Sequence, residues 1–516
     1  MKNISILNDV LGPVMRGPSS SHTAGSYHLA VLARSLLGET PVKAEFKFDS
    51  SGSYSRCFRR QGSDLAFAAA LLGWSMTDQR FPQALELAPK LGLDVRFDTC
   101  TLPEADHPNS VRICVAGGHG PGLSLVGRSI GGGAVEVTSL EGWPVLLDGS
   151  AHEVLAEASA EAAAEVVGLL LRDGQSLAEP DRQVREGLVL LHVRRVSALP
   201  EGLVARLHAL AGVHRLWQAR PLTFVKRGLP LFDSAAGMVA LAEAGGTTAG
   251  RIGAAYEAEL LGLTEDQVVE EMVSRFEVMA AAVHAGLGAD LPPMQLLRPS
   301  AGRVYDADSQ GRLPIGGLHT RTAARAMAAM HVNCGMGVVC AAPTAGSAGV
   351  LPAVLVGLQE EKGLDKRTIA RCLLAAGVIG AIVAQRATFA AEVAGCQVEI
   401  GAAGAMAAAA VVEAANGTAR QAADAAAVSF QNTMGSVCDL VQGIVEIPCH
   451  TRNAVAASSA LVVADLILGG YENPIPLDET IDAVFAVGKM LPPELRVTSL
   501  GGLAIAPSAQ AMRRLR

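Results

Sequence analysis

The stretch from Gly335 to Gly349, GMGVVCAAPTAGSAG, limits the possible folds of this chain more strongly than any other segment. Its second half is almost entirely alanine, glycine and serine, so the backbone can approach a ligand or a neighbouring helix closely. An apolar run begins directly afterwards at Val350. Freed backbone N–H groups at the start of a helix form a cradle for an anion such as a carboxylate. A helix-packing turn in a core of small residues is the alternative interpretation.

The rest of the core must also be built from small side chains. Half of the 516 residues are hydrophobic, but only 4% are aromatic, so alanine, valine, leucine and glycine have to fill most of the interior. Such cores favour closely packed helices. The length is sufficient for two or three domains.

Charge and patterning exclude several classes of protein. A formal net charge of −8 without a long Lys/Arg run argues against a nucleic-acid partner. The first residues lack the apolar region of a signal peptide, so we expect a cytoplasmic protein with reduced cysteines. Apolar stretches recur after residue 335, but Pro343 and Pro352 interrupt one of them, and Gln385 and Arg386 another. We therefore expect a buried helical bundle and no membrane partner.

Residues 1–150 have the pattern of a mixed α/β domain. Alternating apolar residues predict strands at 42–48, 111–115 and 134–139, and a helix is expected at 26–37.

Polar loops of this region suit an active site. Ser19, Ser21 and Thr23 surround His22 at the expected start of the first helix. A hydroxyl-rich loop with one histidine can bind an anion or move a proton, and it can equally serve as a helix cap. The loop His107-Pro108-Asn109 precedes the second strand, and turns or caps explain it as well.

Residues 151–225 change character. Their pattern predicts strand, helix, strand, strand, helix and strand, with helices at 160–171 and 200–210 and the clearest strand at 188–193. This βαββαβ pattern resembles the ACT regulatory fold. The short glycine-turn ligand signature of that fold is missing, so a degenerate spacer and an amino-acid sensor both remain open.

Residues 226–516 are expected to form an all-α domain. The segment 268–287 is amphipathic, and a Pro-rich irregular stretch follows at 291–314. That stretch either covers an active site or is a surface loop.

Three late cysteines carry the most specific chemistry. Cys396, Cys438 and Cys449 are 42 and 11 positions apart, which is not the spacing of a small zinc module. Thiolates supplied by separate helices and loops suit an iron–sulfur cluster better. Three thiolates leave a fourth iron without a protein ligand, and that iron can act as a Lewis acid on a substrate oxygen.

Several short motifs, taken in chain order, make the chain resemble one family, the bacterial iron–sulfur L-serine dehydratases. They are SSSHT at 19–23, HPN at 107–109, SIGGG at 129–133, AAPTAGS at 341–347, GCQ at 395–397, CD at 438–439, PC at 448–449, RN at 452–453 and GGLA at 501–504. The motifs span nearly the whole chain.

The resemblance implies a β-type domain at 1–150, an ACT-like insert at 151–225 and an α-type catalytic domain at 226–516. It implies conversion of L-serine to pyruvate and ammonia by a homodimer with a 4Fe-4S cluster. The implied cluster ligands are Cys396, Cys438 and Cys449, and the implied catalytic residues are Ser21, His22 and His107. The implied substrate-binding residues are Ser19, Thr23, Asn109, Thr344, Ser347, Arg452 and Asn453.

The chemistry can be understood from the residues themselves. Loss of a β-hydroxyl group requires a base for the Cα proton and assistance for a poor leaving group. Pyridoxal phosphate on a lysine is the other route. The helical region contains only four lysines, Lys226, Lys362, Lys366 and Lys489, and two of them lie in a polar run. We therefore disfavour the pyridoxal phosphate route.

The chain departs from the family pattern at three places. Gln61 replaces a histidine of the family, Val398 replaces a glycine, and the tail MRRLR lacks a terminal cysteine found in some members. The first departure leaves threonine, cysteine or 3-hydroxyaspartate open as alternative substrates. A non-catalytic iron–sulfur sensor is the alternative from another class.

Overall fold

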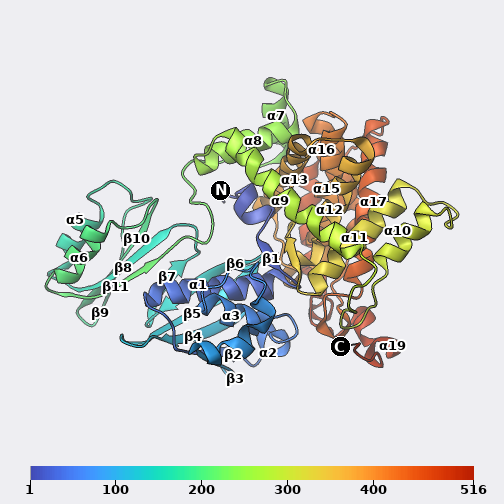
Figure 1. Ribbon diagram of the computed structural model, residues 1–516. Coiled ribbons are helices and arrows are strands. Elements are labelled where there is room, and N and C mark those ends of the chain that lie inside the picture. Colours follow the sequence, from blue (N-terminus) through green and yellow to red (C-terminus); the bar gives the residue numbers. More distant parts are fainter. Residues whose placement is uncertain (1, 516) are drawn as a thin grey trace.

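The computed structural model describes residues 2–515 and places a sheet-containing N-terminal part beside a helical C-terminal part (Figure 1). The largest sheet has the strand order β3-β2-β4-β5-β6-β7, and only β2 and β3 are parallel neighbours. Its strands are β2 Lys43–Asp49, β3 Asp94–Cys100, β4 Ser110–Ala116, β5 Leu123–Gly131, β6 Ala134–Leu140 and β7 Trp143–Leu147. The helices beside it are α1 Gly25–Leu37, α2 Ser53–Cys57, α3 Ser63–Leu71 and α4 Ala84–Leu87.

The alternation of buried and more exposed side chains along the strands explains how this sheet packs. Ala44, Phe46 and Phe48 of β2 are buried, and the ring centroids of Phe46 and Phe67 on α3 are 4.2 Å apart. The three expected strands and the expected helix at 26–37 are confirmed to within two residues at either end.

The middle segment forms its own four-stranded antiparallel sheet, with the order β11-β8-β10-β9. In chain order its elements are β8 His152–Ser159, α5 Ala163–Leu170, β9 Asp181–Arg185, β10 Leu188–Arg195, α6 Glu201–Ala209 and β11 Val213–Ala219. The predicted succession of elements is therefore observed, and it is that of a split βαβ arrangement. The two helices cover the face formed by Val154, Val189 and Leu191.

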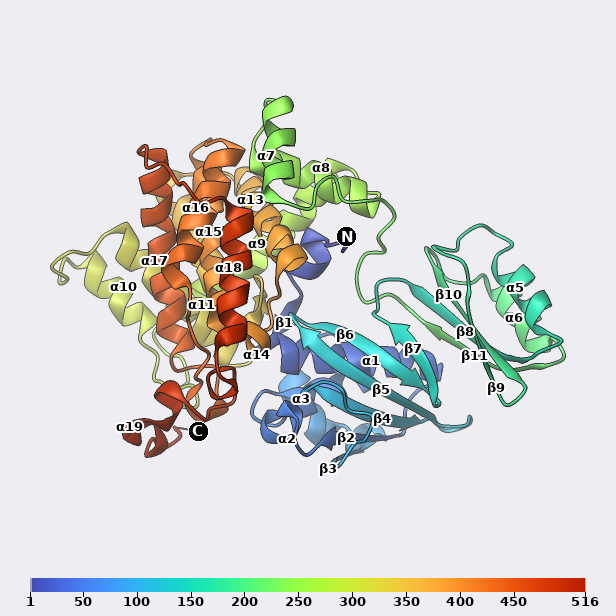
Figure 2. The same ribbon diagram turned by 180° about the vertical axis from the view of Figure 1, so that it is seen from behind.

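The helical part is built around helices that are buried on all sides (Figure 2). Every residue of α15 from Ile400 to Glu413 is buried. Glycine permits such packing, since a Cβ atom at Gly286 of α9 would lie 2.0 Å from the carbonyl oxygen of Ala328 on α11. The helices are α7 Ala235–Ala244, α8 Ala249–Leu261, α9 Glu265–Gly286, α10 Ala301–Ser309, α11 Leu318–Cys334, α12 Val350–Lys362, α13 Lys366–Arg386, α14 Ala391–Ala394, α15 Ile400–Ala414, α16 Ala419–Thr433, α17 Cys449–Leu468, α18 Leu477–Met490 and α19 Pro507–Gln510.

Two expectations about the helical part need correction. The stretch 291–314 is not irregular throughout, because it contains α10. The expectation that no segment has the character of a membrane span is also wrong. By length and composition, three helices could cross a membrane: Lys366–Arg386, Cys396–Ala414 and Cys449–Leu468. Gln385 and Arg386 lie at the end of the first helix and do not interrupt it. The most apolar windows of the first two helices are 78% and 94% buried within the protein.

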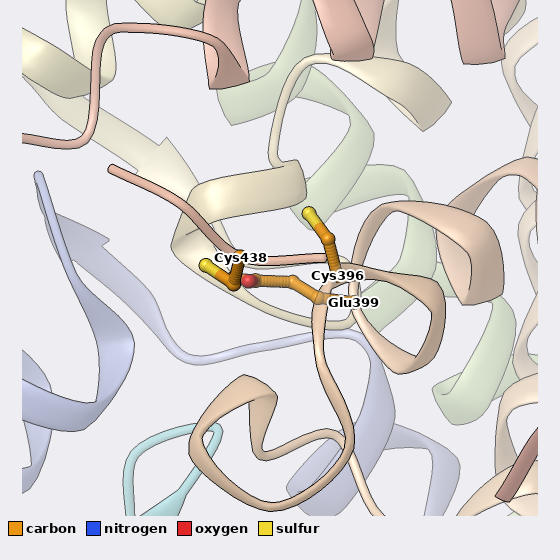
Figure 3. Close-up of side chains that lie close together, drawn as sticks. All are labelled: Cys396, Glu399 and Cys438. Atoms are coloured by element: carbon orange, nitrogen blue, oxygen red, sulfur yellow. The ribbon is translucent and has the colours of Figure 1, made fainter. Parts of the chain in front are cut away.

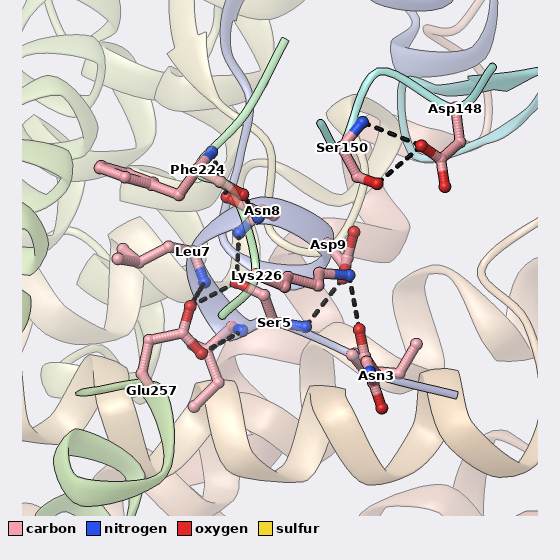
Figure 4. A network of polar contacts seen from close by, with 12 residues as sticks. Asn3, Ser5, Leu7, Asn8, Asp9, Asp148, Ser150, Phe224, Lys226 and Glu257 are labelled. Carbon is pink, nitrogen blue, oxygen red and sulfur yellow. Dashed lines mark hydrogen bonds and ion pairs between the residues drawn. The ribbon is translucent and has the colours of Figure 1, made fainter. Parts of the chain in front are cut away.

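The first residues of the chain join the helical part. The side chain of Ser5 and the backbone N–H groups of Ile6 and Leu7 donate hydrogen bonds to the buried carboxylate of Glu257 on α8 (Figure 4). Strand β1 Val14–Arg16 then pairs antiparallel with β12 Val338–Cys340. This pairing brings the loop after β1 next to the small-residue stretch after β12.

Candidate active site

A small cavity of about 40 Å³ lies where the two loops meet. Ser19, Ser20, Ser21, His22 and Gln61 line it from the N-terminal part. From the helical part it is lined by Thr344, Gly346, Phe389, Glu392, Glu399, Cys438 and Cys449, among others. Hydroxyl, thiol and carboxyl groups therefore converge on one enclosed space.

The three late cysteines come together although they lie on separate elements. Cys396 begins the helical turn η6 Cys396–Val398, Cys438 lies in the loop after α16, and Cys449 is the first residue of α17. All three side chains are buried and free of disulfides. Ligand atoms of Cys396, Cys438 and Glu399 lie within 4.8 Å of one another (Figure 3).

The thiols influence one another electrostatically. A hydrogen bond with Cys396 and burial together raise the pKa of Cys438 well above its usual value. Burial, with a further contribution from Cys396, raises the pKa of Cys449 in the same way. A bound cation would lower the pKa of these thiols again, because it stabilises the thiolates. Arg452 lowers the pKa of Cys449 by its charge, but burial outweighs this effect. Three thiols buried together thus fit a metal or iron–sulfur centre.

A carboxylate completes this group. Thr344 Oγ1 donates to Glu399 Oε1 over 2.5 Å, and Thr344 Oγ1 lies 3.0 Å from Ser347 Oγ. A Cβ atom at Gly346 would lie 2.3 Å from Glu399 Oε1, so any larger residue there would displace the carboxylate. The pKa of Glu399 is raised to about 7, mainly by burial and to a smaller extent by nearby Glu392.

The opposite wall is the hydroxyl-rich loop. Ser19 caps the turn η2 Ser20–Ala24 by accepting from the backbone N–H of His22 over 3.2 Å. The His22 ring lies 3.4 Å from Ser19 Oγ through Nδ1 and 3.2 Å from Ser53 Oγ through Nε2. Burial lowers the pKa of His22 to about 4. The imidazole is therefore neutral near pH 7 and retains one unprotonated nitrogen.

Comparison with known proteins gives the family. The model of the family described as serine dehydratase alpha chain matches residues 151–504. The chain belongs to this family. It is 39% identical over 260 residues to the probable L-serine dehydratase alpha chain of Bacillus subtilis, covering 50% of this chain and 87% of the relative. The L-serine dehydratase alpha chain of Peptoniphilus asaccharolyticus is 38% identical over 252 residues, with coverages of 49% and 86%.

A further relative is the L-serine dehydratase beta chain of the same Peptoniphilus species. It is 36% identical over 149 residues, which cover 29% of this chain and 66% of the relative. This family member therefore resembles both an alpha chain and a beta chain within one polypeptide.

Some residues expected in the serine dehydratase site line the cavity. They are Ser19, Ser21, His22, Thr344, Cys438 and Cys449, and Cys396 lies beside Cys438 and Glu399.

The other expected residues surround the cavity without lining it. Asn453 binds the carbonyl oxygens of Gly346 and Cys449 and the N–H of Gly349. Arg452 pairs with Asp439 at 3.0 Å. These side chains hold the loops in place.

Four further residues expected at the site also lie behind its walls. Ser347 donates to the carbonyl oxygen of Ala342. Thr23 donates to the carbonyl oxygen of Gln61 over 2.7 Å. His107 accepts from the backbone N–H of Asn109, in a loop whose Pro108 carbonyl binds Ser53, the partner of His22.

Sequence reasoning missed Glu399 and Glu392. Glu399 lies three residues after Cys396, which is about one helical turn. Glu392 is a single carboxylate in the otherwise apolar run FAAEVAG. A charge within an apolar run was the signal that could have identified it.

Proposed function

We propose that this chain is an iron–sulfur-dependent L-serine ammonia-lyase that converts L-serine to pyruvate and ammonia in the cytoplasm. The observation that carries the proposal is that two buried thiols, a partly buried carboxyl group and a hydroxyl-rich loop line one cavity, with the third thiol, Cys396, beside them. The names of the alpha-chain and beta-chain relatives support the same substrate.

The residues Cys396, Cys438 and Cys449 would hold a 4Fe-4S cluster. When bound, such a cluster has one iron without a protein thiolate and supplies Lewis acidity toward the β-hydroxyl group of the substrate. The chain itself binds and orients the amino acid and accepts the Cα proton.

We assign the proton-accepting role to His22. Its imidazole is neutral at pH 7 and lines the cavity, where Ser19 and Ser53 fix the ring. Removal of the Cα proton and loss of the hydroxyl group as water leave an enamine, which tautomerises to an imine and hydrolyses to pyruvate and ammonia. In this proposal, hydroxyl groups of the Ser19–His22 loop receive the substrate carboxylate.

The deciding experiment is anaerobic purification with iron and sulfide analysis, followed by assays of keto acid and ammonia. We expect iron and sulfide in the protein, release of pyruvate from L-serine, loss of activity in air and recovery with ferrous iron under reductant. An iron-free protein that turns over L-serine stably in air would overturn the proposal. A fully loaded protein without turnover of any amino acid would favour the sensor alternative.

Another 3-hydroxy amino acid is the second candidate substrate, and Gln61 is the observation that favours it. Gln61 lines the cavity and its side-chain amide donates to the carbonyl oxygen of Gly443 over 3.3 Å. An amide binds polar groups but transfers no proton near neutral pH, so it could select a substrate with an additional polar group.

A further inference from the structure

The cavity has an unusual balance of charge. Its lining includes two carboxyl groups, Glu392 and Glu399, but no lysine or arginine. Neither carboxylate forms an ion pair with any residue in the described range 2–515. His22 supplies no positive charge, because its imidazole is neutral. The protein thus leaves these carboxylates without a cation, and burying an unpaired charge is costly.

Glu399 is held in one orientation. Thr344 Oγ1 donates to its Oε1 atom over 2.5 Å, and that oxygen lies against the backbone at Gly346. The other oxygen, Oε2, accepts no hydrogen bond from the part of the chain that the structure describes. It therefore remains available to a ligand in the cavity.

The hydrogen bond from Thr344 to Glu399 changes the role expected for Thr344. A threonine hydroxyl has one hydrogen to donate, and Thr344 uses it for Glu399. The expectation that Thr344 and Ser347 bind the substrate carboxylate therefore does not fit this geometry, because Ser347 likewise donates to backbone carbonyl oxygens. In the proposed function, the substrate carboxylate is received on the opposite wall, by the Ser19–His22 loop.

These positions fix the orientation of a small zwitterion. With its β-hydroxyl group at the thiols and its carboxylate at the Ser19–His22 loop, the remaining ammonium group faces the carboxylate wall. We infer that Glu399 binds the α-ammonium group of the substrate and that Thr344 positions Glu399, with Glu392 as the second carboxyl group in the cavity lining. This inference rests on the proposed amino-acid lyase function and adds the residue that distinguishes amino acids from hydroxy acids.

The test compares Glu399→Gln with Glu413→Gln. Glu413 is a matched control, because it is a helical-domain carboxylate that accepts from a threonine, Thr248, over 2.7 Å, as Glu399 accepts from Thr344, and it does not line the cavity. Each protein is purified anaerobically, and its iron content and cluster absorbance are measured before kinetics. Competitive inhibition by D-serine and by 3-hydroxypropanoate, which lacks the ammonium group, is measured in parallel.

We expect Glu399→Gln to retain the iron content of the wild type and to raise KM for L-serine and the inhibition constant of D-serine about tenfold or more, the loss typical of a hydrogen bond to a charged group. The inhibition constant of 3-hydroxypropanoate should change less than about twofold. Thr344→Val should raise KM by a smaller factor, and Glu413→Gln should leave KM unchanged.

Two results would overturn the inference. Loss of iron in Glu399→Gln would identify Glu399 as a metal ligand, and equal weakening of D-serine and 3-hydroxypropanoate would show that the ammonium group is not recognised there. A wild-type protein that turns over no amino acid would instead reject the proposed function itself.

Discussion

At the scale of single residues, His22 shows how the site holds a neutral side chain in place through hydrogen bonds to its backbone. His22 is neutral because it is buried, and the carbonyl oxygen of His22 accepts from both Ser26 and Ser63 over 2.5 and 2.7 Å. The turn that carries the imidazole is therefore anchored on both sides. Such anchoring keeps a reacting group in place without additional charge.

The cysteines give the first prediction. Cys396→Ser, Cys438→Ser and Cys449→Ser should each abolish iron incorporation and activity, because all three thiols belong to one buried group. Cys57→Ser and Cys100→Ser serve as controls outside the cavity and should retain both. Iron analysis and visible absorbance of anaerobic protein provide the measurement. Full cluster absorbance in any of the first three variants would contradict the assignment.

Gln61 gives the second prediction. We expect L-serine to have the highest kcat/KM among L-serine, L-threonine, L-cysteine and 3-hydroxyaspartate, and Gln61→His to change the value for L-serine less than about tenfold. The reason is that the amide is already engaged with the Gly443 carbonyl oxygen and serves to position the wall. A preference of more than about a hundredfold for another substrate, near 2.7 kcal/mol, would contradict this expectation.

Part of the site could be predicted from the motifs in the sequence. Which of the other residues line the cavity depends on the direction of their side chains. The three cysteines were found from their motifs and not from residue type, because Cys334, Cys340 and Cys372 are also buried thiols of the helical part and do not line the cavity. Ser347 and Asn453 were expected to touch the substrate, but Ser347 donates to the carbonyl oxygen of Ala342, and Asn453, on α17, donates to that of Gly346. Sequence spacing does not show these side-chain directions, because they depend on how α17 packs against the loop.

At the scale of elements, strand patterns were more informative than loops. The alternation in β2 and the succession of six elements in the middle segment followed from hydrophobic periodicity. Helix α10 was missed because prolines and polar residues surround it. The position of α10 depends on contacts with side chains of other helices, and a charged cluster provides one of these contacts.

That cluster joins α11 and α12. Arg321 donates to both oxygens of Glu361, and Arg325, which is 1% exposed, donates to Glu361 over 3.0 Å and to Glu360 over 2.6 Å. Asp308 at the end of α10 also pairs with Arg321 at 2.8 Å. Hydrogen bonds from Arg321 are the main cause that lowers the pKa of Glu361 to about 2.

The third prediction follows from this pKa. A carboxyl group whose pKa falls from 4.5 to about 2 on folding stabilises the protein above pH 4.5, and this contribution is lost as the pH falls toward 2. Glu361→Gln should reduce the free energy of unfolding by about 2 to 3 kcal/mol at pH 7 and by about half as much at pH 3.

Urea unfolding at the two pH values checks this prediction. Glu277→Gln is the matched control, because Glu277 pairs with Lys366 at 2.6 Å but both side chains are more than half exposed. It should cost less than about 1 kcal/mol. An equal loss for Glu361→Gln at pH 7 and pH 3 would mean that packing and not charge explains the effect.

At the scale of the whole molecule, the site exists only where the two parts meet. The Ser19–His22 loop and Gln61 come from one part, while the carboxylates and thiols come from the other. The parts are joined by the β1–β12 pair and by Glu257, which binds the first residues of the chain. The covalent connection after β11 also takes part, because Asn8 and Phe224 exchange hydrogen bonds and Lys226 binds Asp9 and the carbonyl oxygen of Asn3 (Figure 4).

The last prediction concerns that connection. The alpha and beta chains of Peptoniphilus asaccharolyticus are separate proteins that each resemble part of this chain. We therefore expect a protease site inserted after Pro230, beside the 72% exposed Leu229, to be cut without loss of assembly. The two fragments should elute together in size-exclusion chromatography and retain their iron and most of the activity.

A variant tests whether the noncovalent joints cause this behaviour. Glu257→Ala leaves the donors of Ser5, Ile6 and Leu7 without their acceptor, which costs about 1 to 3 kcal/mol for each buried unpaired group. Once cut, this variant should separate into its fragments and lose activity, while the uncut variant keeps its parts together through the connection. Separation of the cut protein with Glu257 intact would show that the connection, and not the N-terminal contact, holds the site closed.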